Sequence, residues 1–388
     1  MNTLTIPILL VNQALSPDPA AAIASLRELG PPGLATLIEH GQPGPALRTG
    51  IDLVGAQRDN VCGLYWYTDL DKARDAARAE NKPIVSLRLL GRLDEDLSCA
   101  NSRFLRTAIY ANDQIATVLK DRFILHWQSV RPAPRITIDF GDGRRIERTI
   151  TGNSLHYLLD IDGRPLEVLP GLCGPGPFLS WIEESYGLFA RLQATASPRQ
   201  RRSKLRSHHA IAYNRLVASW QRDLAAVGVA DAVPGTANVV VRPTALAAAP
   251  VAVTKALVEL PMVTTMASLG DRLAARTNQT LWPDLAELYR DGARLTPSSI
   301  AVMTRKTLVT PAMIDRFEQS LAEDAVRNEY VFGRRIHQWF AAGETGSLPE
   351  LTSRIYGELF LTPDEDPWLG LLPAGIYAAL EENGVTGP

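Results

Sequence analysis

The sequence predicts an α/β chain: a mixed sheet flanked by helices, with an inserted β-hairpin, followed by a mainly α-helical C-terminal domain. Between Trp66 and Leu192 the patterns run helix, strand, helix, strand, hairpin, strand, strand, helix. Strands joined through a helix run parallel and strands joined by a short turn run antiparallel, so this order gives a mixed sheet. After Ser197 the composition changes, and most of the remaining chain has helical patterns.

The first elements of this region have clear start and stop residues. Thr68 or Asp69 can cap a helix, Asn81 suits its left-handed end, and Pro83 prevents its continuation. An apolar strand follows at once. The further elements expected in this half are the strand 84–90, a helix beginning near Cys99, a helix at 114–120 and a strand at 123–130.

The second half contains a hairpin and an antiparallel pair. Polar and apolar residues alternate from 135 to 151 around Gly141-Asp142-Gly143, which predicts two strands joined by a turn. Asp162-Gly163 predicts a second turn between strands at 155–160 and 166–169, and 178–192 is helical.

Three further segments surround residues 66–192. Residues 1–65 are expected to be an N-terminal extension, with a helix near 19–29 and a Pro/Gly-rich stretch at 30–50. Residues 193–262 contain a basic helix and an Ala/Val/Pro-rich linker, and residues 263–388 form the helical C-terminal domain. The three Thr-Pro pairs predict helix starts, at Thr296, Thr310 and Thr362.

Charge and cysteine content exclude several classes of function. Forty basic and 42 acidic residues give a formal net charge of −2, which does not favour nucleic acid or an anionic membrane as a partner. No apolar run reaches the ~18 residues that span a bilayer, and the N-terminus lacks the features of a secretory signal. Three scattered cysteines do not make a disulfide scaffold, so we expect a cytoplasmic protein.

The segment Cys99-Ala100-Asn101-Ser102 carries the strongest chemical information in the chain. It follows the buried strand 84–90 and opens a helix. At a helix N-terminus the backbone N–H groups and the helix dipole stabilise a thiolate, which is the nucleophilic form of cysteine. Nearby arginines, Arg103 among them, favour the thiolate as well, whereas the acidic residues at 94–96 disfavour it.

Over about residues 66–192 the chain resembles the thioredoxin-like family. The resemblance is carried by Glu80-Asn81-Lys82-Pro83 before the strand, the Cys-x-x-Ser motif at a helix start, Thr151-Gly152, and the turn 158–163, in the family's order. It implies a thioredoxin-like mixed sheet and a redox-active Cys99. Asn153 and Ser154 would then form part of the substrate groove, next to Arg103.

The chain departs from the family pattern at four positions. Ser102 stands where a second cysteine would resolve a disulfide, and Ser98 replaces the aromatic residue before the first cysteine. No proline occurs near Ser154, where the family has a cis-proline, and Leu87 replaces the buried acid. These four differences favour a domain that has lost redox turnover.

Three cysteines are assigned different roles. Cys99 is the expected nucleophile, with an inert buried cysteine as the alternative. Ser102, one turn along, could donate a hydrogen bond to its thiolate or be an ordinary polar residue of the first helical turn. Cys173 lies in the loop before the last helix of the sheet region, where it could resolve a mixed disulfide if the two Cα atoms lie within about 7 Å; a loop cysteine with no such partner is the alternative. Cys62 precedes the domain and is expected to be structural.

No metal site and no cofactor are expected. The six histidines and three cysteines show no zinc-ligand spacing. His126 and His156 lie in expected strands, where they could face one another or be ordinary core histidines, and His208-His209 is assigned to a solvated helix face.

Two functions of different classes follow. The first is monothiol or partner-resolved thiol-disulfide exchange through Cys99, with a client protein or a small thiol such as glutathione as the partner. The second is a redox-inactive thioredoxin-like scaffold or binding protein that recognises a protein partner. A third possibility, an enzyme site around Trp282, Trp339 and Trp368, is less favoured because such aromatics are more often core residues.

Overall fold

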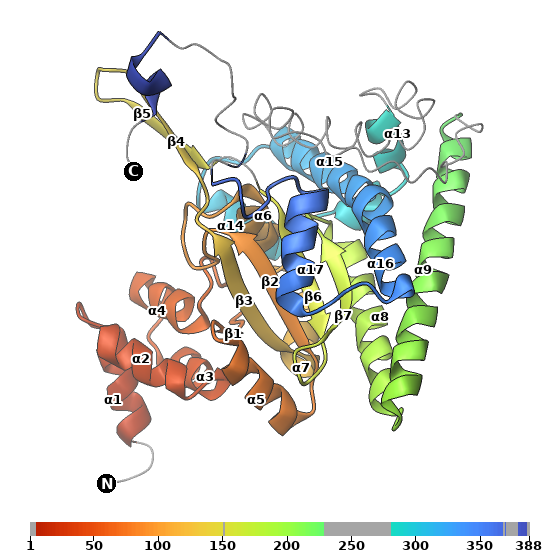
Figure 1. Ribbon diagram of the computed structural model, residues 1–388. Helices are drawn as coiled ribbons and strands as arrows, with labels where there is room; N and C mark the ends of the chain where they lie inside the picture. The colour runs from red at the N-terminus through yellow and green to blue at the C-terminus, as the bar shows by residue number, and fades with distance from the viewer. Residues whose placement is uncertain (1–4, 150–151, 229–280, 368, 370–378, 386–388) are drawn as a thin grey trace.

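The central feature of the computed structural model is a five-stranded sheet with helices on both faces (Figure 1). The structure describes residues 5–149, 152–228, 281–367, 369 and 379–385. The strands of the sheet, in spatial order, are β1 (Trp66–Tyr67), β3 (Ile124–Arg131), β2 (Ile84–Leu90), β6 (Ser154–Leu159) and β7 (Pro165–Pro170).

The strand directions confirm the mixed sheet that the sequence predicts. β1 and β2 pair with β3 in parallel, whereas β6 pairs antiparallel with β2 and β7 antiparallel with β6. The inserted hairpin is also present, as a separate two-stranded sheet of β4 (Arg135–Asp139) and β5 (Arg145–Thr149). Residues 150 and 151, at the end of the expected hairpin, lie outside the described residues.

Helices begin and end where capping residues require it. The carboxylate of Asp69 accepts hydrogen bonds from the amides of residues 71 and 72, and Asn81 takes the left-handed conformation that ends the helix. The helices of the sheet region are α5 (Leu70–Glu80), α6 (Ala100–Ala108), α7 (Asp113–Arg122) and α8 (Pro175–Gln193).

The two faces of the sheet carry different chemistry. On the back face, Leu87 of β2 is paired with His156, whose ring contacts Phe178 of α8. Ser86 and Arg88 point to the front face because alternate residues of a strand face opposite ways. Figure 1 shows α17 (Leu348–Arg354) crossing in front of the sheet, while α6 and α14 (Pro297–Thr304) lie behind it.

The N-terminal 65 residues contain four helices rather than one helix and an irregular Pro/Gly-rich stretch. Pro31 and Pro45 each stand in the first turn of a helix after a glycine N-cap, where a proline has no amide to leave unpaired. These helices share a small apolar core that includes Leu26, Leu34 and Val54. They are α1 (Thr5–Ala14), α2 (Ala20–Glu28), α3 (Pro31–His40) and α4 (Pro45–Gly55).

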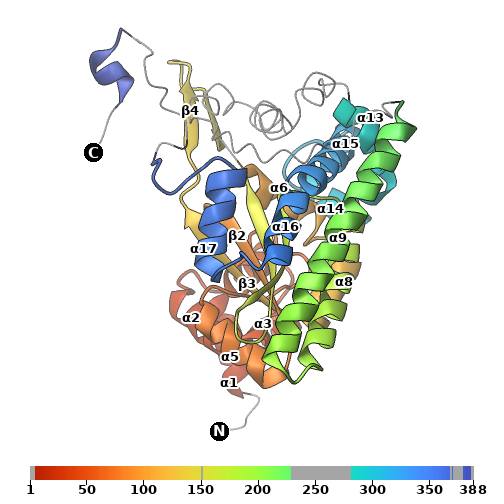
Figure 2. The ribbon, with the colours of Figure 1, turned by 45° about the vertical axis from the view of Figure 1, so that its right-hand side comes forward.

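The C-terminal region is mainly helical, as expected, and packs into the same core as the sheet. Phe332, Trp339 and Tyr356 belong to one buried apolar cluster with the residues of β2 and β6. Its elements are α9 (Pro198–Ala226), α13 (Leu281–Glu287), η2 (Arg290–Ala293), α14, α15 (Pro311–Arg327), η3 (Asn328–Gly333), α16 (Arg334–Ala342), α17, η4 (Ile355–Leu359) and η5 (Glu381–Gly384). Figure 2 shows α8, α9 and α16 side by side.

Two of the three Thr-Pro pairs begin helices. The hydroxyls of Thr296 and Thr310 cap α14 and α15. Thr362 is different: the expected helix is absent, because the carbonyl oxygens of Thr362 and Pro363 accept hydrogen bonds from the Arg131 guanidinium. Most of the expected linker at 227–261, and Trp368, lie outside the described residues.

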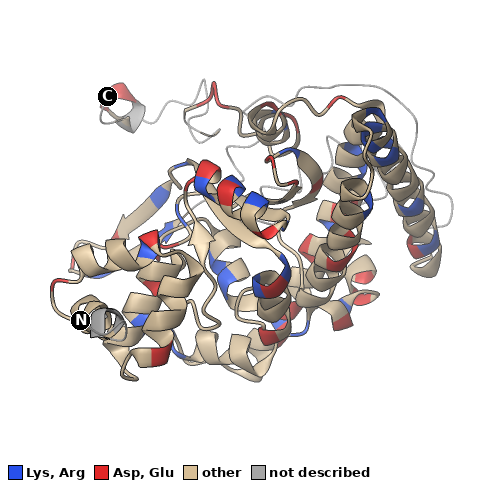
Figure 3. Ribbon diagram, turned by 90° about the horizontal axis from the view of Figure 1, so that it is seen from below, with Lys and Arg blue, Asp and Glu red and all other residues tan. Residues whose placement is uncertain are grey.

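Basic and acidic residues are interspersed over the helices seen from below in Figure 3, as the formal net charge of −2 suggests. Among the described residues, no helix has the length and apolar character needed to cross a bilayer. Trp282 and Trp339 are core residues, only 1% and 2% exposed.

His126 and His156 do not face one another. Their partners in β2 are Ser86 and Leu87, which point to opposite faces of the sheet. The His126 Nδ1 lies 2.8 Å from the Ser86 Oγ, and the His156 Nε2 lies 2.6 Å from the Tyr110 hydroxyl. Burial lowers the pKa of each histidine to about 3, so both are neutral at pH 7.

These two histidines predict acid destabilisation. In the unfolded chain they gain protons near pH 6.5, whereas in the folded chain they stay neutral down to about pH 3. The folded state therefore loses stability as the pH falls below 6.5, approaching about 1.4 kcal/mol per pH unit for each histidine. Urea denaturation between pH 7.5 and 4.5 measures this slope.

His126→Asn keeps a hydrogen-bonding side chain beside Ser86 but removes the titration, so the acid slope becomes shallower. His40→Asn, in exposed α3, is the matched control and leaves the slope unchanged. If His126→Asn leaves the pH dependence of the unfolding free energy unchanged, His126 is not a buried neutral histidine that destabilises the fold in acid.

Candidate functional site

Cys99 is the N-cap of α6. The amide of Ser102 donates to its Sγ at 3.4 Å, and the amide of Cys99 donates to the Leu90 carbonyl at the end of β2. The Ser102 Oγ accepts a hydrogen bond from the Ser98 Oγ at 3.1 Å. The sequence therefore placed Cys99 correctly at a helix start, where backbone amides face its sulfur.

Two arginines of α6 interact electrostatically with this thiol. The Nη2 of Arg103 donates to the Thr149 Oγ1 at 2.9 Å, and Nη1 of Arg106 donates to the Glu95 carbonyl at 2.8 Å. Burial lowers the pKa of both guanidinium groups, and the nearby Cys99 acts in the opposite direction. Arg106 is fully buried and holds the loop before Cys99 in place.

The backbone groups expected to receive a client are engaged within the chain. The Asn153 carbonyl accepts a hydrogen bond from the Tyr356 hydroxyl at 3.2 Å, and the Ser154 carbonyl accepts one from the Gly171 amide at 2.7 Å. The Ser154 Oγ accepts a hydrogen bond from the Asn101 side chain at 3.4 Å. Tyr356, in η4, thus satisfies one of the backbone carbonyls that the sequence analysis expected to face a client.

Five of the six predicted site residues are buried, and Arg103 is half-buried. Cys99, Ser102 and Ser154 are 0% exposed, Cys173 is 3% exposed and Asn153 4%. Tyr356 is buried, and its pKa is raised by burial and by the neighbouring Cys99. Access of any reagent to the Cys99 sulfur therefore requires a local opening of the structure, and Tyr356 of η4 is one of the groups near this sulfur.

The other two cysteines are thiols as well. Cys173 lies near Tyr110 in the loop before α8, and burial raises the pKa of that tyrosine. The pairing of Cys173 with Cys99 stays a prediction. Cys62 is half-buried, and burial together with a hydrogen bond to Asp113 raises its pKa to about 12.

A pocket of about 1250 Å³ lies on the front face of the sheet. It extends from β2 and β3 to the ends of α8 and α9, and α17 closes one side. Its apolar wall includes leucines of α5, β7, α9 and α17, which are Leu70, Leu166, Leu205 and Leu348.

Arg88 is the buried cation of this pocket. It is 5% exposed, and its Nη1 donates to the Ser86 Oγ at 2.7 Å. Within the described part of the chain, its Nε and Nη2 make no hydrogen bond and its guanidinium forms no ion pair with a carboxylate. Burial lowers its pKa to about 10, which leaves it cationic at neutral pH.

The remaining charges of the pocket leave an excess of cations. The lining acids are paired: Asp160 with Arg164, Asp162 with Arg78 and Arg164, and Asp364 with Arg131. Arg201 and Arg202 of α9 line the pocket and, among the described residues, have no carboxylate partner. The pocket therefore favours a negatively charged ligand.

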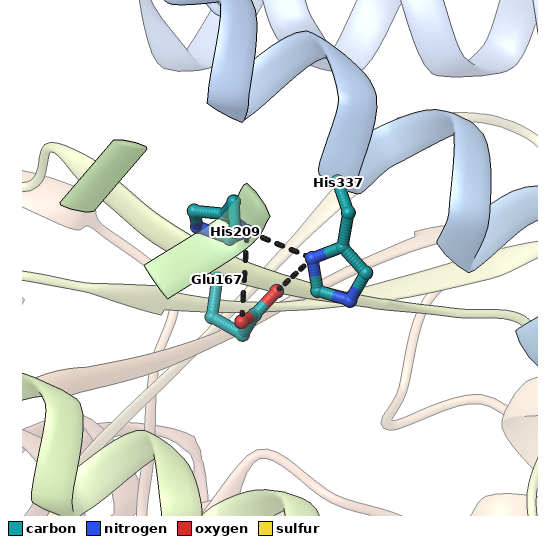
Figure 4. A group of neighbouring side chains, drawn as sticks. All are labelled: Glu167, His209 and His337. Atoms are coloured by element: carbon teal, nitrogen blue, oxygen red, sulfur yellow. Dashed lines mark hydrogen bonds and ion pairs between the residues drawn. The ribbon is translucent and has the colours of Figure 1, made fainter. Parts of the chain in front are cut away.

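A second polar group lies between β7, α9 and α16, where Glu167, His209 and His337 meet (Figure 4). His209 is 0% exposed, which corrects the expectation of a solvated helix face at His208-His209. The helical pattern of α9 did not reveal this because α16, which covers His209, lies more than a hundred residues later.

Arg88 was counted in the sequence only among the arginines near Cys99, and its place in a pocket was not expected. An arginine in the middle of an apolar strand, Ile-Val-Ser-Leu-Arg-Leu-Leu, was the available indication, because buried charges are rare without a partner.

Comparison with known proteins adds no assignment: no family model, no curated protein and no solved structure matches this chain.

The burial of Cys99 predicts slow modification of this thiol. In a variant with Cys62→Ser and Cys173→Ser, 5,5′-dithiobis(2-nitrobenzoate) is expected to react with the Cys99 thiol only after the η4 segment opens. An opening cost of about 3 kcal/mol slows the reaction about 100-fold relative to the urea-unfolded chain. Stopped-flow absorbance measures both rates.

Tyr356→Ala in the same background uncovers the sulfur and raises the rate at least about 10-fold. Tyr213→Ala, in α9, is the matched control and leaves the rate unchanged. A native rate equal to that of the unfolded chain contradicts the covered site.

Proposed function

We propose that this chain is a binding protein in which a thioredoxin-like domain serves as a framework without redox turnover, and that its ligand is an organic anion with an apolar body. The observation that carries the proposal is Arg88, a buried guanidinium that lines a pocket of about 1250 Å³ and whose Nε and Nη2 have no hydrogen-bond partner among the described residues. The ligand's carboxylate or phosphate takes the place of the missing counter-charge.

The chemistry of the guanidinium suits this role. Its planar donors match the two oxygens of a carboxylate or phosphate, and charge-assisted hydrogen bonds of this kind are the strong ones. The Arg88 Nη1 donates to the Ser86 Oγ and lies 3.3 Å from the His126 Nδ1, so the side chain is oriented before a ligand arrives. Preorganisation of this kind lowers the entropy cost of binding.

The apolar wall determines the rest of the ligand. Leu166, Leu205 and Leu348 come from three different elements, and the pocket is large enough for a ring system or a branched chain. A small inorganic anion would leave this wall uncovered, so an organic anion fits both parts of the pocket.

The thioredoxin-like framework is supported by the strand order β1-β3-β2-β6-β7, with the last two strands antiparallel to their neighbours. The loss of redox turnover is supported by the burial of Cys99 and by Ser102, which stands where a second cysteine would be needed. Tyr356 on the Asn153 carbonyl supports it further, because the client groove is filled by the chain itself.

Thiol-disulfide exchange is the second candidate, favoured by the position of Cys99 at the N-terminus of α6. The Cys99 thiolate would attack a client disulfide and release one client thiolate. Cys173, or a small thiol such as glutathione, would then attack the mixed disulfide and free the second client sulfur. Fast modification of native Cys99 would support this candidate over the first.

Anionic and neutral dyes of similar shape test the proposal. 1-Anilinonaphthalene-8-sulfonate combines a sulfonate with an apolar ring system, and N-phenyl-1-naphthylamine lacks the charge. Arg88→Met removes charge-assisted hydrogen bonds worth about 1.5–3 kcal/mol. It is therefore expected to weaken binding of the anionic dye at least about 10-fold and to leave binding of the neutral dye nearly unchanged. Fluorescence titration gives both dissociation constants.

Arg222→Met, on the exposed side of α9, is the matched control and leaves both dyes unchanged. Arg88→Met also removes a buried charge that burial disfavours, so the variant is expected to fold at least as stably as the parent chain. If Arg88→Met weakens binding of both dyes equally, or of neither dye, the result contradicts an anion site at Arg88.

A further inference from the structure

The Glu167 carboxylate is a buried charge that needs a cation. Its side chain is 8% exposed, and among the described residues it has no lysine or arginine within ion-pair distance. The amide of Val168 donates to Oε1 at 3.0 Å and the ring of His208 lies 3.2 Å from Oε2. Buried carboxylates are normally paired with a cation or bound to a metal ion.

Two imidazole nitrogens converge on this carboxylate. The Nδ1 atoms of His209 and His337 each lie 3.9 Å from an oxygen of Glu167, and they lie 2.8 Å from each other. Figure 4 shows the three side chains directed toward one another from β7, α9 and α16. All the ligand atoms lie within 4.8 Å of one another.

The protonation state of His209 is fixed by its second nitrogen. Its Nε2 lies 2.9 Å from the Leu166 carbonyl, which can only accept, so Nε2 carries the proton. In the neutral ring Nδ1 then has a lone pair directed into the cluster. A backbone carbonyl that orients an imidazole in this way is the usual outer partner of a metal-bound histidine.

The neighbouring rings hold His209 in this orientation. Phe340 stacks on it with ring centroids 4.1 Å apart, and the His337 Nδ1–H donates to the His209 Nδ1. For a metal to bind, the His337 proton moves from Nδ1 to Nε2 within the same ring. No net proton has to be released for that change.

We propose that Glu167, His209 and His337 form a binding site for a divalent transition-metal cation, with Zn²⁺ as the reference ion. Ligands about 2.0–2.1 Å from a tetrahedral zinc ion lie about 3.3 Å apart, and the three separations here lie on both sides of that value. Two neutral nitrogens and one carboxylate also match the preference of zinc. The fourth position is left for water or a ligand atom.

Charge supports the same assignment. One carboxylate and two imidazole nitrogens in their neutral form give the site a single negative charge, which a divalent cation offsets. The cation would join β7, α9 and α16, and so tie the C-terminal region to the sheet.

This site is separate from the anion pocket, because none of its three residues lines that pocket. The failure of either proposal leaves the other standing.

Zinc titration tests the site directly. Full-length protein without a polyhistidine tag is treated with a chelator, dialysed and titrated with Zn²⁺ in an isothermal calorimeter. One zinc ion per chain is expected, together with a rise in the melting temperature. Removal of a ligand in His337→Ala or Glu167→Gln weakens Zn²⁺ binding by more than about 100-fold.

His40→Ala is the matched control, because His40 lies beside Glu39 on the surface of α3 and could bind zinc adventitiously. This variant retains the high-affinity zinc ion. Cobalt(II) in the parent protein gives a readout that needs no variant: intense visible absorption bands indicate a tetrahedral site. The proposal is overturned if the parent chain binds no stoichiometric zinc, if a folded His337→Ala binds zinc as the parent does, or if cobalt(II) gives only the weak bands of an octahedral ion.

Discussion

The contact between the C-terminal segment and the sheet is the constraint on which the described site depends. Tyr356 donates a buried hydrogen bond to the Asn153 carbonyl, and Arg131 donates to the carbonyls of Thr362, Pro363 and Asp366. A single buried bond of this kind contributes about 1 kcal/mol, but an unsatisfied buried donor or acceptor costs more, so the contacts form or break together. This contact brings Tyr356 near the buried Cys99, and α17, which leads into η4, closes the pocket.

The pocket is the space in front of the sheet that the C-terminal segment leaves open. α17 covers the front of the sheet, and within the described ranges the Nε and Nη2 of Arg88 find no hydrogen-bond partner, although an unpaired buried charge opposes folding. A chain selected only for stability would have an apolar residue at that position of β2. Functional sites are where such local costs persist, because they are recovered when the ligand binds.

The sequence predicted the local structure well and the long-range contacts poorly. Asp69, Asn81 and Cys99 act at helix ends through their own neighbours, so their roles were readable from the chain. Tyr356 over Asn153 and His337 beside His209 join segments more than a hundred residues apart, and no local pattern encodes those distances. Thr362 shows the same limit. In a helix the carbonyls of Thr362 and Pro363 would accept hydrogen bonds from amides of the next turn, but here they accept from the distant Arg131 guanidinium.

The central claim is that Arg88 anchors an organic anion in front of the sheet. The most direct measurement is a crystal of the full chain soaked with 4-iodobenzoate, in which anomalous scattering locates the iodine without reference to the chain. We expect the carboxylate within hydrogen-bonding distance of the Arg88 Nε and Nη2, and the iodine against the leucines of β7, α9 and α17. A pocket without iodobenzoate at saturating concentration, or a carboxylate bound away from Arg88, would contradict it.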